Sequence, residues 1–234
     1  MFGYILTAAM LLPFSNASPY TSTTTAMSNA FHVTGCDVSG LTPNLPSGQT
    51  QLTVPTGTKP VFVALGVGVQ NYTCGSTGTY ASAGAVAEFF DLSCFVSQRG
   101  ESQLQTIIFN LWNGDKSLTV DQLIKAFGTS KIVLGQHYFV TNPVTGTGIS
   151  PEFDFRTGAK KGDPNGFVIA AKSGDIVSPD GPTNVDWLEL TNVKGDLAKQ
   201  VFRIDTNGGV APSSCTPGSP LISVKYAAQY WLYN

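Results

Sequence analysis

Short runs of β-branched and aromatic residues, separated by turn-forming residues, make up most of the chain after residue 60. Val61–Val69 is one such run, and Gly75–Gly78 predicts a hairpin turn into a second run over Thr79–Phe90. Further strands are expected at Ile132–Thr141, Glu152–Arg156, Phe167–Lys172, Val185–Thr191, Ala198–Thr206 and Ser223–Tyr233. Many short strands joined by Gly, Pro and Asn turns predict one all-β domain, built as a sandwich or a barrel.

One segment shows the pattern of a helix. Thr119 is a suitable N-cap, Gln122 completes a capping box three residues later, and Gly128 follows the last apolar position at Phe127. We therefore expect one short helix near Thr119–Phe127. Residues 101–112 match neither pattern clearly and remain unassigned.

The first residues are typical of a secretory leader. Ile5–Phe14 is an apolar run too short to cross a bilayer, and Ser15-Asn16-Ala17 places small residues at a cleavage site. We expect a signal peptide over residues 1–17, a flexible Ser/Thr-rich mature N-terminus over 18–35 and the β domain over 36–234. These features predict a secreted, extracellular protein.

The composition indicates which classes of binding partner are not expected. Charged residues make up 12% of the chain, the net charge is −2, and the basic residues are scattered singly except for Lys160-Lys161. Nucleic acid and anionic membranes are bound through clustered basic residues, so neither is expected as a partner. The sequence does not predict an oligomeric state.

The four cysteines indicate two disulfide bonds. Cys36, Cys74, Cys94 and Cys215 all follow the expected leader, and an even count is typical of secreted domains. Four cysteines allow three pairings, and their spacing does not choose among them. No C-x-x-C pair occurs, so a metal site is not expected. Asn71-Tyr72-Thr73 is a candidate N-glycosylation site of a secreted glycoprotein.

One histidine and two carboxylates are the candidate catalytic residues. His137 lies in an expected strand, and Glu152 and Asp154 share one face of the next, opposite Phe153 and Phe155. His137 with Glu152 or Asp154 would supply a general acid–base pair. The alternative is structural: a strand histidine hydrogen-bonded in the core and a solvated acidic face over an aromatic one. No G-x-S-x-G motif of a serine hydrolase occurs.

Aromatic residues crowd the last expected strand. Alternation assigns Tyr226 and Tyr230 to one face and Trp231 and Tyr233 to the other. At least one face must belong to the core, and the other could stack on sugar rings.

The glycines at Gly66 and Gly68 resemble the start of a dinucleotide-binding motif. The third glycine position holds Asn71, and turn residues rather than a helix follow it. We therefore expect a strand whose glycines allow a bulge or close packing, and no cofactor.

Several motifs of the chain resemble a secreted family that is common in fungi. They are Gly66–Cys74, Gly84–Ala87, Asp91–Cys94, Gly135–Phe139, Pro151–Phe155, Val185–Leu188, Arg203–Gly209 and Tyr226–Trp231. The resemblance spans residues 36–233. The family is classed as a domain of unknown function, and its members often carry a malate dehydrogenase label. Bacterial members retain only the cysteines matching Cys74 and Cys215, which implies a Cys74–Cys215 bond and leaves Cys36 for Cys94.

The residues argue against a Rossmann-type malate dehydrogenase. Such an enzyme needs a nicotinamide site and arginines that clamp carboxylates, whereas Arg99, Arg156 and Arg203 lie in widely separated segments. We favour a non-enzymatic protein that binds an extracellular glycan, a cell-wall component or a host-surface component. The alternatives are a secreted hydrolase or lyase using His137, and a secreted factor acting on host tissue.

Overall fold

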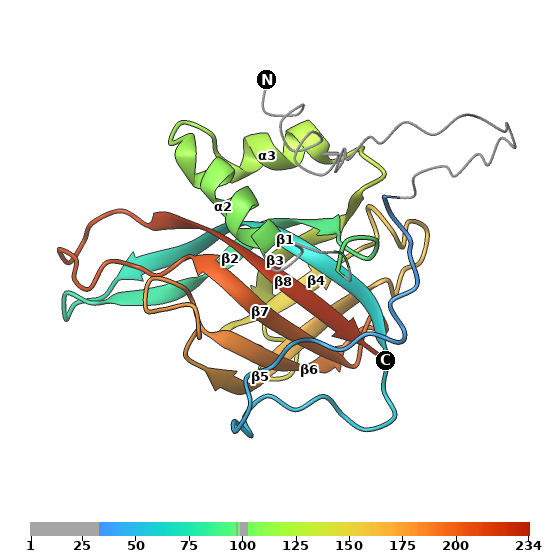
Figure 1. The fold of residues 1–234 in the computed structure, drawn as a ribbon. Coiled ribbons are helices and arrows are strands. Elements are labelled where there is room, and N and C mark those ends of the chain that lie inside the picture. Colours follow the sequence, from blue (N-terminus) through green and yellow to red (C-terminus); the bar gives the residue numbers. More distant parts are fainter. Residues whose placement is uncertain (1–32, 97, 99–102) are drawn as a thin grey trace, which may run out of the picture.

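The computed structural model describes residues 33–96, 98 and 103–234. The expected signal peptide and most of the expected flexible segment lie outside these residues. The strands are β1 (Pro60–Cys74), β2 (Tyr80–Asp91), β3 (Val133–Thr141), β4 (Ile149–Asp154), β5 (Phe167–Ile176), β6 (Trp187–Lys194), β7 (Gln200–Gly208) and β8 (Ile222–Tyr233). Each pairs antiparallel with its neighbour in sequence, and β8 pairs with β1 to close a barrel (Figure 1). The all-β prediction is confirmed, and the architecture is the barrel.

Both faces of several strands are buried, which explains why β1 reads as a continuous apolar run. Ala64 on β1 belongs to the cluster inside the barrel, whereas its neighbours Val63 and Leu65 belong to a second cluster on the outer face. The inner cluster also contains Phe89, Phe153 and other side chains from around the barrel. A strand buried on both faces has no polar side to expose, so its sequence loses the alternation of a half-buried strand.

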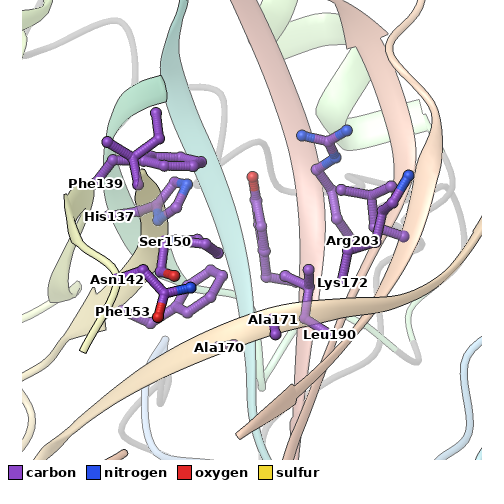
Figure 2. Close-up of a pocket in the computed structure, with 14 residues that line it drawn as sticks. His137, Phe139, Asn142, Ser150, Phe153, Ala170, Ala171, Lys172, Leu190 and Arg203 are labelled. Carbon is purple, nitrogen blue, oxygen red and sulfur yellow. The ribbon is translucent and has the colours of Figure 1, made fainter. Parts of the chain in front are cut away.

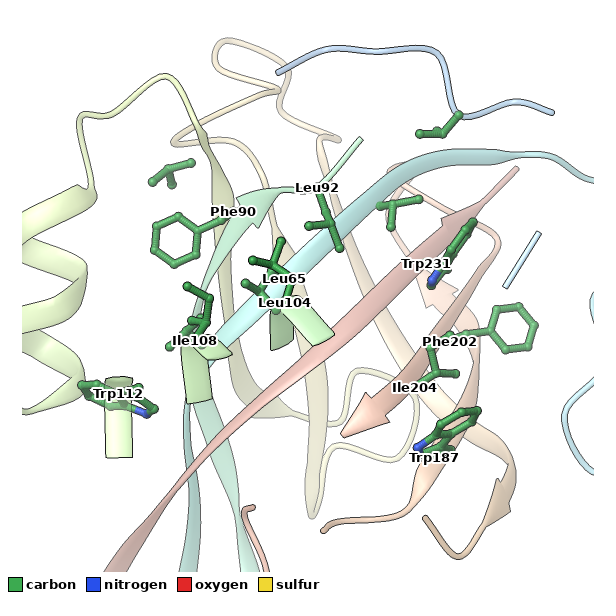
Figure 3. Close-up of a cluster of buried hydrophobic side chains, with 14 of the residues drawn as sticks. Leu65, Phe90, Leu92, Leu104, Ile108, Trp112, Trp187, Phe202, Ile204 and Trp231 are labelled. Atoms are coloured by element: carbon green, nitrogen blue, oxygen red, sulfur yellow. The ribbon is translucent and has the colours of Figure 1, made fainter. Parts of the chain in front are cut away.

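The outer cluster is covered by two helices, α2 (Leu104–Gly114) and α3 (Val120–Phe127) (Figures 1 and 3). Ile108 and Trp112 of α2 are fully buried, and Phe127 of α3 meets Phe90 of β2 edge to face at 5.3 Å. The Trp112 indole Nε1 donates to the Gly68 carbonyl oxygen at 2.8 Å, which fixes α2 to the wall of the barrel. None of the described helices is long and apolar enough to cross a membrane.

The helix prediction was right for one helix and missed the other. Thr119 caps α3 through the Gln122 backbone N–H, and the Gln122 side chain accepts from the Thr119 backbone N–H, which is the predicted capping box. Helix α2 occupies the unassigned stretch. Its N-cap, Gln103, makes no side-chain cap hydrogen bond, so the local signal that revealed α3 is missing.

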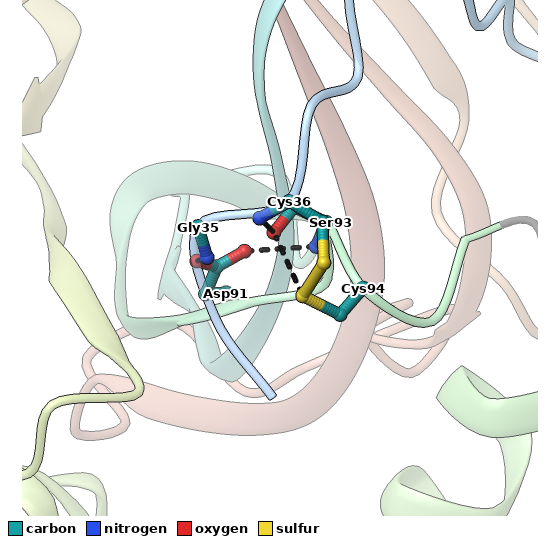
Figure 4. The surroundings of a disulfide bond; sticks show 5 residues. All are labelled: Gly35, Cys36, Asp91, Ser93 and Cys94. Atoms are coloured by element: carbon teal, nitrogen blue, oxygen red, sulfur yellow. Dashed lines mark hydrogen bonds between the residues drawn. A yellow bond between two sulfur atoms is a disulfide. The ribbon is translucent and has the colours of Figure 1, made fainter. Parts of the chain in front are cut away.

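Two disulfide bonds fasten the segments around the barrel. They join Cys36 to Cys94 and Cys74 to Cys215, the pairing implied by the family resemblance. Figure 4 shows the first bond, with Asp91 accepting from the Gly35 N–H and the Ser93 hydroxyl accepting from the Cys36 N–H. This bond attaches the N-terminal segment to the end of β2.

The glycine-rich stretch of β1 is a closely packed strand, as expected. A Cβ on Gly66 would lie 2.6 Å from the Tyr230 ring, and one on Gly68 would lie 2.0 Å from the Val86 carbonyl oxygen. These positions accept no side chain, so the glycines serve packing between β1 and its neighbours.

Candidate functional site

A cavity of about 360 Å³ lies in the barrel, among side chains from several of its strands (Figure 2). Its lining is mainly apolar and comes from the strands β3 to β8. The lining residues are His137, Phe139, Asn142, Ile149, Ser150, Pro151, Phe153, Ala170, Ala171, Lys172, Leu188, Leu190, Arg203 and Tyr230. Ala170, a small residue of the inner cluster, leaves part of this space, because large side chains fill the same layer on neighbouring strands.

The cavity reaches the surface where β4 and β5 separate. Only three residue pairs, from Glu152–Ile169 to Asp154–Phe167, join these strands. Beyond that point β4 continues beside β3 and β5 continues beside β6. The separated edges, at Ile149–Pro151 and Ala170–Lys172, both line the cavity. We call this opening the β4–β5 seam, and it gives the interior an entrance through the side of the barrel.

His137 forms part of an aromatic wall in the cavity. Its ring stacks on Phe153, with centroids 4.6 Å apart and planes 10° apart, and it is 3% exposed. The Nδ1 atom lies 2.9 Å from the Glu152 main-chain oxygen. A carbonyl oxygen only accepts, so Nδ1 carries the proton and Nε2 carries the lone pair. Burial lowers the pKa of His137 to about 4, so the ring is neutral near pH 7.

Arg203 brings a positive charge into this apolar space. It lies on β7 and is partly buried. Its Nε and Nη2 atoms donate to the Asp186 main-chain oxygen at 3.2 and 2.8 Å. Its charge also contributes to the low pKa of His137 and acts against the burial that raises the pKa of Tyr230.

Two tyrosines add hydroxyl groups to the interior of the barrel. The Tyr226 and Tyr230 hydroxyl oxygens lie 2.9 Å apart, and both side chains are almost completely buried. Burial is the main reason why the pKa of each phenol is raised, so both remain protonated. The prediction that these two share a face is confirmed, and Trp231 and Tyr233 lie in the outer cluster.

The predicted catalytic residues do not form one site. Glu152 and Asp154 share a face, as predicted, and that face is opposite the side on which Phe153 stacks with His137. The two carboxylates bind the Arg156 guanidinium at 2.8 and 2.7 Å. Because strand alternation separates them from the imidazole, the acid–base pair of the hydrolase hypothesis is not assembled by these residues.

The cluster around Arg156 is an ion-pair network on the outer face. The Tyr138 hydroxyl donates to Asp154 at 2.8 Å, and burial is the main reason why its pKa is raised. Burial also acts to raise the pKa of Asp154, but hydrogen bonds from Arg156 and Tyr138 outweigh it and keep the carboxyl below its ordinary value. Burial raises the pKa of Glu152 against the attraction of Arg156. These contacts hold β3 and β4 together below the β4–β5 seam.

A second cavity, of about 550 Å³, lies outside the barrel against α2 and β7. Asp180, Asn184, Asp205 and Asn207 contribute polar groups to its lining, and no Lys or Arg lines it among the described residues. Asn184 already accepts from the Gly208 N–H, and Asn207 accepts from the Thr106 hydroxyl. This cavity is polar and acidic, in contrast to the one inside the barrel.

The candidate glycosylation site lies on β1. Asn71 is partly exposed, and its side-chain oxygen accepts from the Ser223 hydroxyl at 2.7 Å. Glycosylation of Asn71 stays a prediction.

The two charged cavity residues, Lys172 and Arg203, were not singled out as site residues from the sequence. Arg203 had a detectable signal, since it replaces an apolar residue within the strand run Val201–Ile204. The side of the strand that faces the barrel interior depends on pairing between distant segments, and the run itself does not give it.

Comparison with known proteins identifies the family of the chain but does not indicate a function. No curated protein and no solved structure matches the chain. The family model described as a protein of unknown function (DUF3455) matches residues 55–234, which include all eight strands. The chain therefore belongs to the DUF3455 family of proteins of unknown function.

Proposed function

We propose that this protein is a secreted binding protein that holds a small, largely apolar molecule inside its barrel. The observation that carries the proposal is the cavity of about 360 Å³, lined mainly by apolar side chains and entered at the β4–β5 seam. Eight-stranded barrels are wide enough to hold one small ligand, and apolar cavities with a few polar groups are typical ligand sites. Two disulfide bonds and the leader-like N-terminus support secretion.

Binding fits the site better than the acid–base chemistry expected of His137. The imidazole is neutral, stacked on Phe153 and held by the Glu152 main-chain oxygen. Glu152 and Asp154, the proposed partners, are engaged with Arg156 on the other face. An aromatic wall with a fixed ring suits the packing of an apolar molecule.

The test is a titration of the purified protein with N-phenyl-1-naphthylamine, a neutral apolar probe whose fluorescence rises in apolar surroundings. We expect saturable binding at one site. The Ala171→Trp variant should weaken it at least about tenfold, because a large ring at the seam would occupy the entrance. Ala171 is exposed, so this change should not disturb the core.

Thr191→Trp is the matched control. Thr191 is exposed and pairs with Ala171 across β5 and β6, but it does not line the cavity. It should bind the probe as the unmodified protein does. Absence of saturable binding, or equal loss in both variants, would contradict the proposal.

The second cavity favours a second candidate function, the binding of an extracellular glycan expected from the sequence. Its carboxylates and amides, with no cationic residue among the described lining, suit a neutral molecule rich in hydroxyl groups. Retention on insoluble cellulose, chitin or β-glucan that Asp180→Asn weakens and Asp163→Asn does not would support it. Equal retention of both variants, or none on any polymer, would count against it.

A further inference from the structure

The charges around the cavity are of one sign. Arg203 contributes a permanent positive charge, and Lys172 lies at the rim. No Asp or Glu belongs to the lining within the described part of the chain. The only other titratable side chains in the lining are His137 and Tyr230, and both are neutral near pH 7. The cavity is therefore apolar with a positive end.

The guanidinium of Arg203 is not neutralised by an ion pair. Within the described residues, the carboxylates in salt bridges contact Arg156 and Lys172, and none contacts Arg203. Asp186 reaches Arg203 through its main-chain oxygen rather than its carboxylate. Those two bonds use one N–H each of Nε and Nη2, and a hydrogen bond to the Tyr230 hydroxyl uses a third of the five N–H groups of the guanidinium. Further donors therefore remain for a ligand oxygen.

A partly buried charge without a counter-ion is unfavourable in a stable scaffold. A side chain removed from water loses hydration, and an apolar side chain of similar size would serve packing better at the same place. The neighbouring inward residues Val201 and Leu190 are apolar and buried, which shows what this layer otherwise contains. A charge in this position is explained if the ligand supplies the opposite one.

We propose that the ligand of the barrel is an aromatic carboxylic acid, whose carboxylate binds Arg203 and whose ring packs against His137 and Phe153. This inference rests on the proposed function and specifies the class of molecule. Arg203 can offer two parallel N–H groups to a carboxylate, the geometry in which arginine binds it most strongly. The stacked rings of His137 and Phe153 present a flat surface of aromatic character on the same cavity. Lys172, at the rim, is paired with Asp175 at 3.1 Å, so Arg203 is the charge that selects the carboxylate.

The test compares two probes that share the naphthalene ring and differ in its substituent, the anionic 2-naphthoate and the neutral 2-naphthalenemethanol, by calorimetric titration at pH 7 in about 0.1 M salt. We expect the acid to bind at least about tenfold more tightly than the alcohol, since a charge-assisted hydrogen bond is worth more than a neutral one. Arg203→Gln should remove this preference and leave binding of the alcohol within about threefold.

Two further variants control the experiment. Arg203→Lys keeps the charge and should retain a reduced preference, which separates loss of charge from loss of packing. Lys199→Gln removes an exposed charge between β6 and β7, outside the cavity lining, and should change nothing. Urea unfolding of each variant checks that Arg203→Gln remains folded.

The outcomes separate the two proposals. If both probes bind equally well, the ligand is not selected by charge and this inference is overturned, while the binding function stands. If the acid is preferred as strongly by Arg203→Gln as by the unmodified protein, Arg203 does not recognise the carboxylate and the inference is again overturned. If neither probe binds, the proposed function itself fails.

Discussion

Glu88 should make the protein less stable as the pH rises from 4 to 8. It lies on the outer face of β2, is 1% exposed, and contacts the Gln136 amide at 3.2 Å. Its neighbours on that face, Val86 and Phe90, pack in the cluster beneath the helices. Burial raises the pKa of Glu88 from 4.5 to about 7, against the smaller effect of the Gln136 hydrogen bond.

The sign follows from the protons bound in each state. Between pH 4.5 and 7 the unfolded chain releases the Glu88 proton while the folded chain retains it, which favours unfolding. Below this range both states are protonated, and above it the difference is constant. The difference between a pKa of 4.5 in the unfolded chain and about 7 in the folded one, at about 1.36 kcal/mol per pH unit, sets an upper limit of about 3 kcal/mol on the free energy lost. Since a Gln side chain is neutral at every pH, Glu88→Gln should remove this loss.

The assay is urea unfolding of the unmodified protein and Glu88→Gln at pH 4, 5, 6, 7 and 8. The difference in unfolding free energy should be smallest at pH 4, where both side chains are neutral. It should then grow to about 2–3 kcal/mol in favour of the variant at pH 8. The pH 4 measurement is an internal control for packing changes. A difference that stays constant from pH 4 to 8 would refute the argument that burial shifts this carboxyl.

Other perturbations have equally definite outcomes. His137 should act in the opposite direction to Glu88: its pKa falls to about 4, so stability is lost as the pH falls from 6.5 to 4. Urea unfolding should show that the unmodified protein loses about 2–3 kcal/mol of unfolding free energy over that interval and that His137→Gln does not. If the unfolding free energy of both proteins depended on pH in the same way, this prediction would be contradicted. Replacing Cys74 and Cys215 by Ser removes a bond between residues 141 apart in sequence, and in the chain-entropy model this should lower the free energy of unfolding by about 5 kcal/mol. The same replacement of Cys36 and Cys94, which are 58 residues apart, should lower it by about 4 kcal/mol. Denaturant midpoints of the two double variants check the order, and a larger loss for the shorter separation would contradict the entropic account.

The strands could be predicted because their signals are local. Each expected run corresponds to one strand of the barrel, and the turn at Gly75–Gly78 lies between β1 and β2. The largest errors are at ends that depend on tertiary contacts. The β5 strand continues to Ile176 through Lys172-Ser173-Gly174-Asp175, a polar stretch that pairs with β6. Pairing with a distant strand stabilises residues whose own propensity for β structure is low.

Helix α2 shows a different limit. Leu104, Ile108 and Trp112 recur at intervals of four residues and are buried, which is a helical pattern. The segment lacks a side-chain cap and an acidic first turn, so its beginning carries no local signal. It is held by tertiary contacts, including the Lys225 ammonium group, which lies 3.8 Å from the centre of the Trp112 ring and donates to the Trp112 carbonyl oxygen. Such contacts depend on β8, more than a hundred residues away in sequence.

The cavity could not be predicted, because it is a property of strand pairing rather than of any one segment. Alternation correctly places Phe153 opposite Glu152, but it does not show which face is enclosed or that Arg203 shares the enclosure with His137. That depends on closure of β8 on β1 and on the early separation of β4 from β5. Pro151 lies at the separated edge and has no N–H to donate, so the strand sequence itself helps to leave this edge unpaired. The sequence of β4 therefore contributes to the opening of the seam. Ala171 lies on the opposite edge of the same seam and is exposed, so a substitution there tests the entrance without disturbing the core of the barrel.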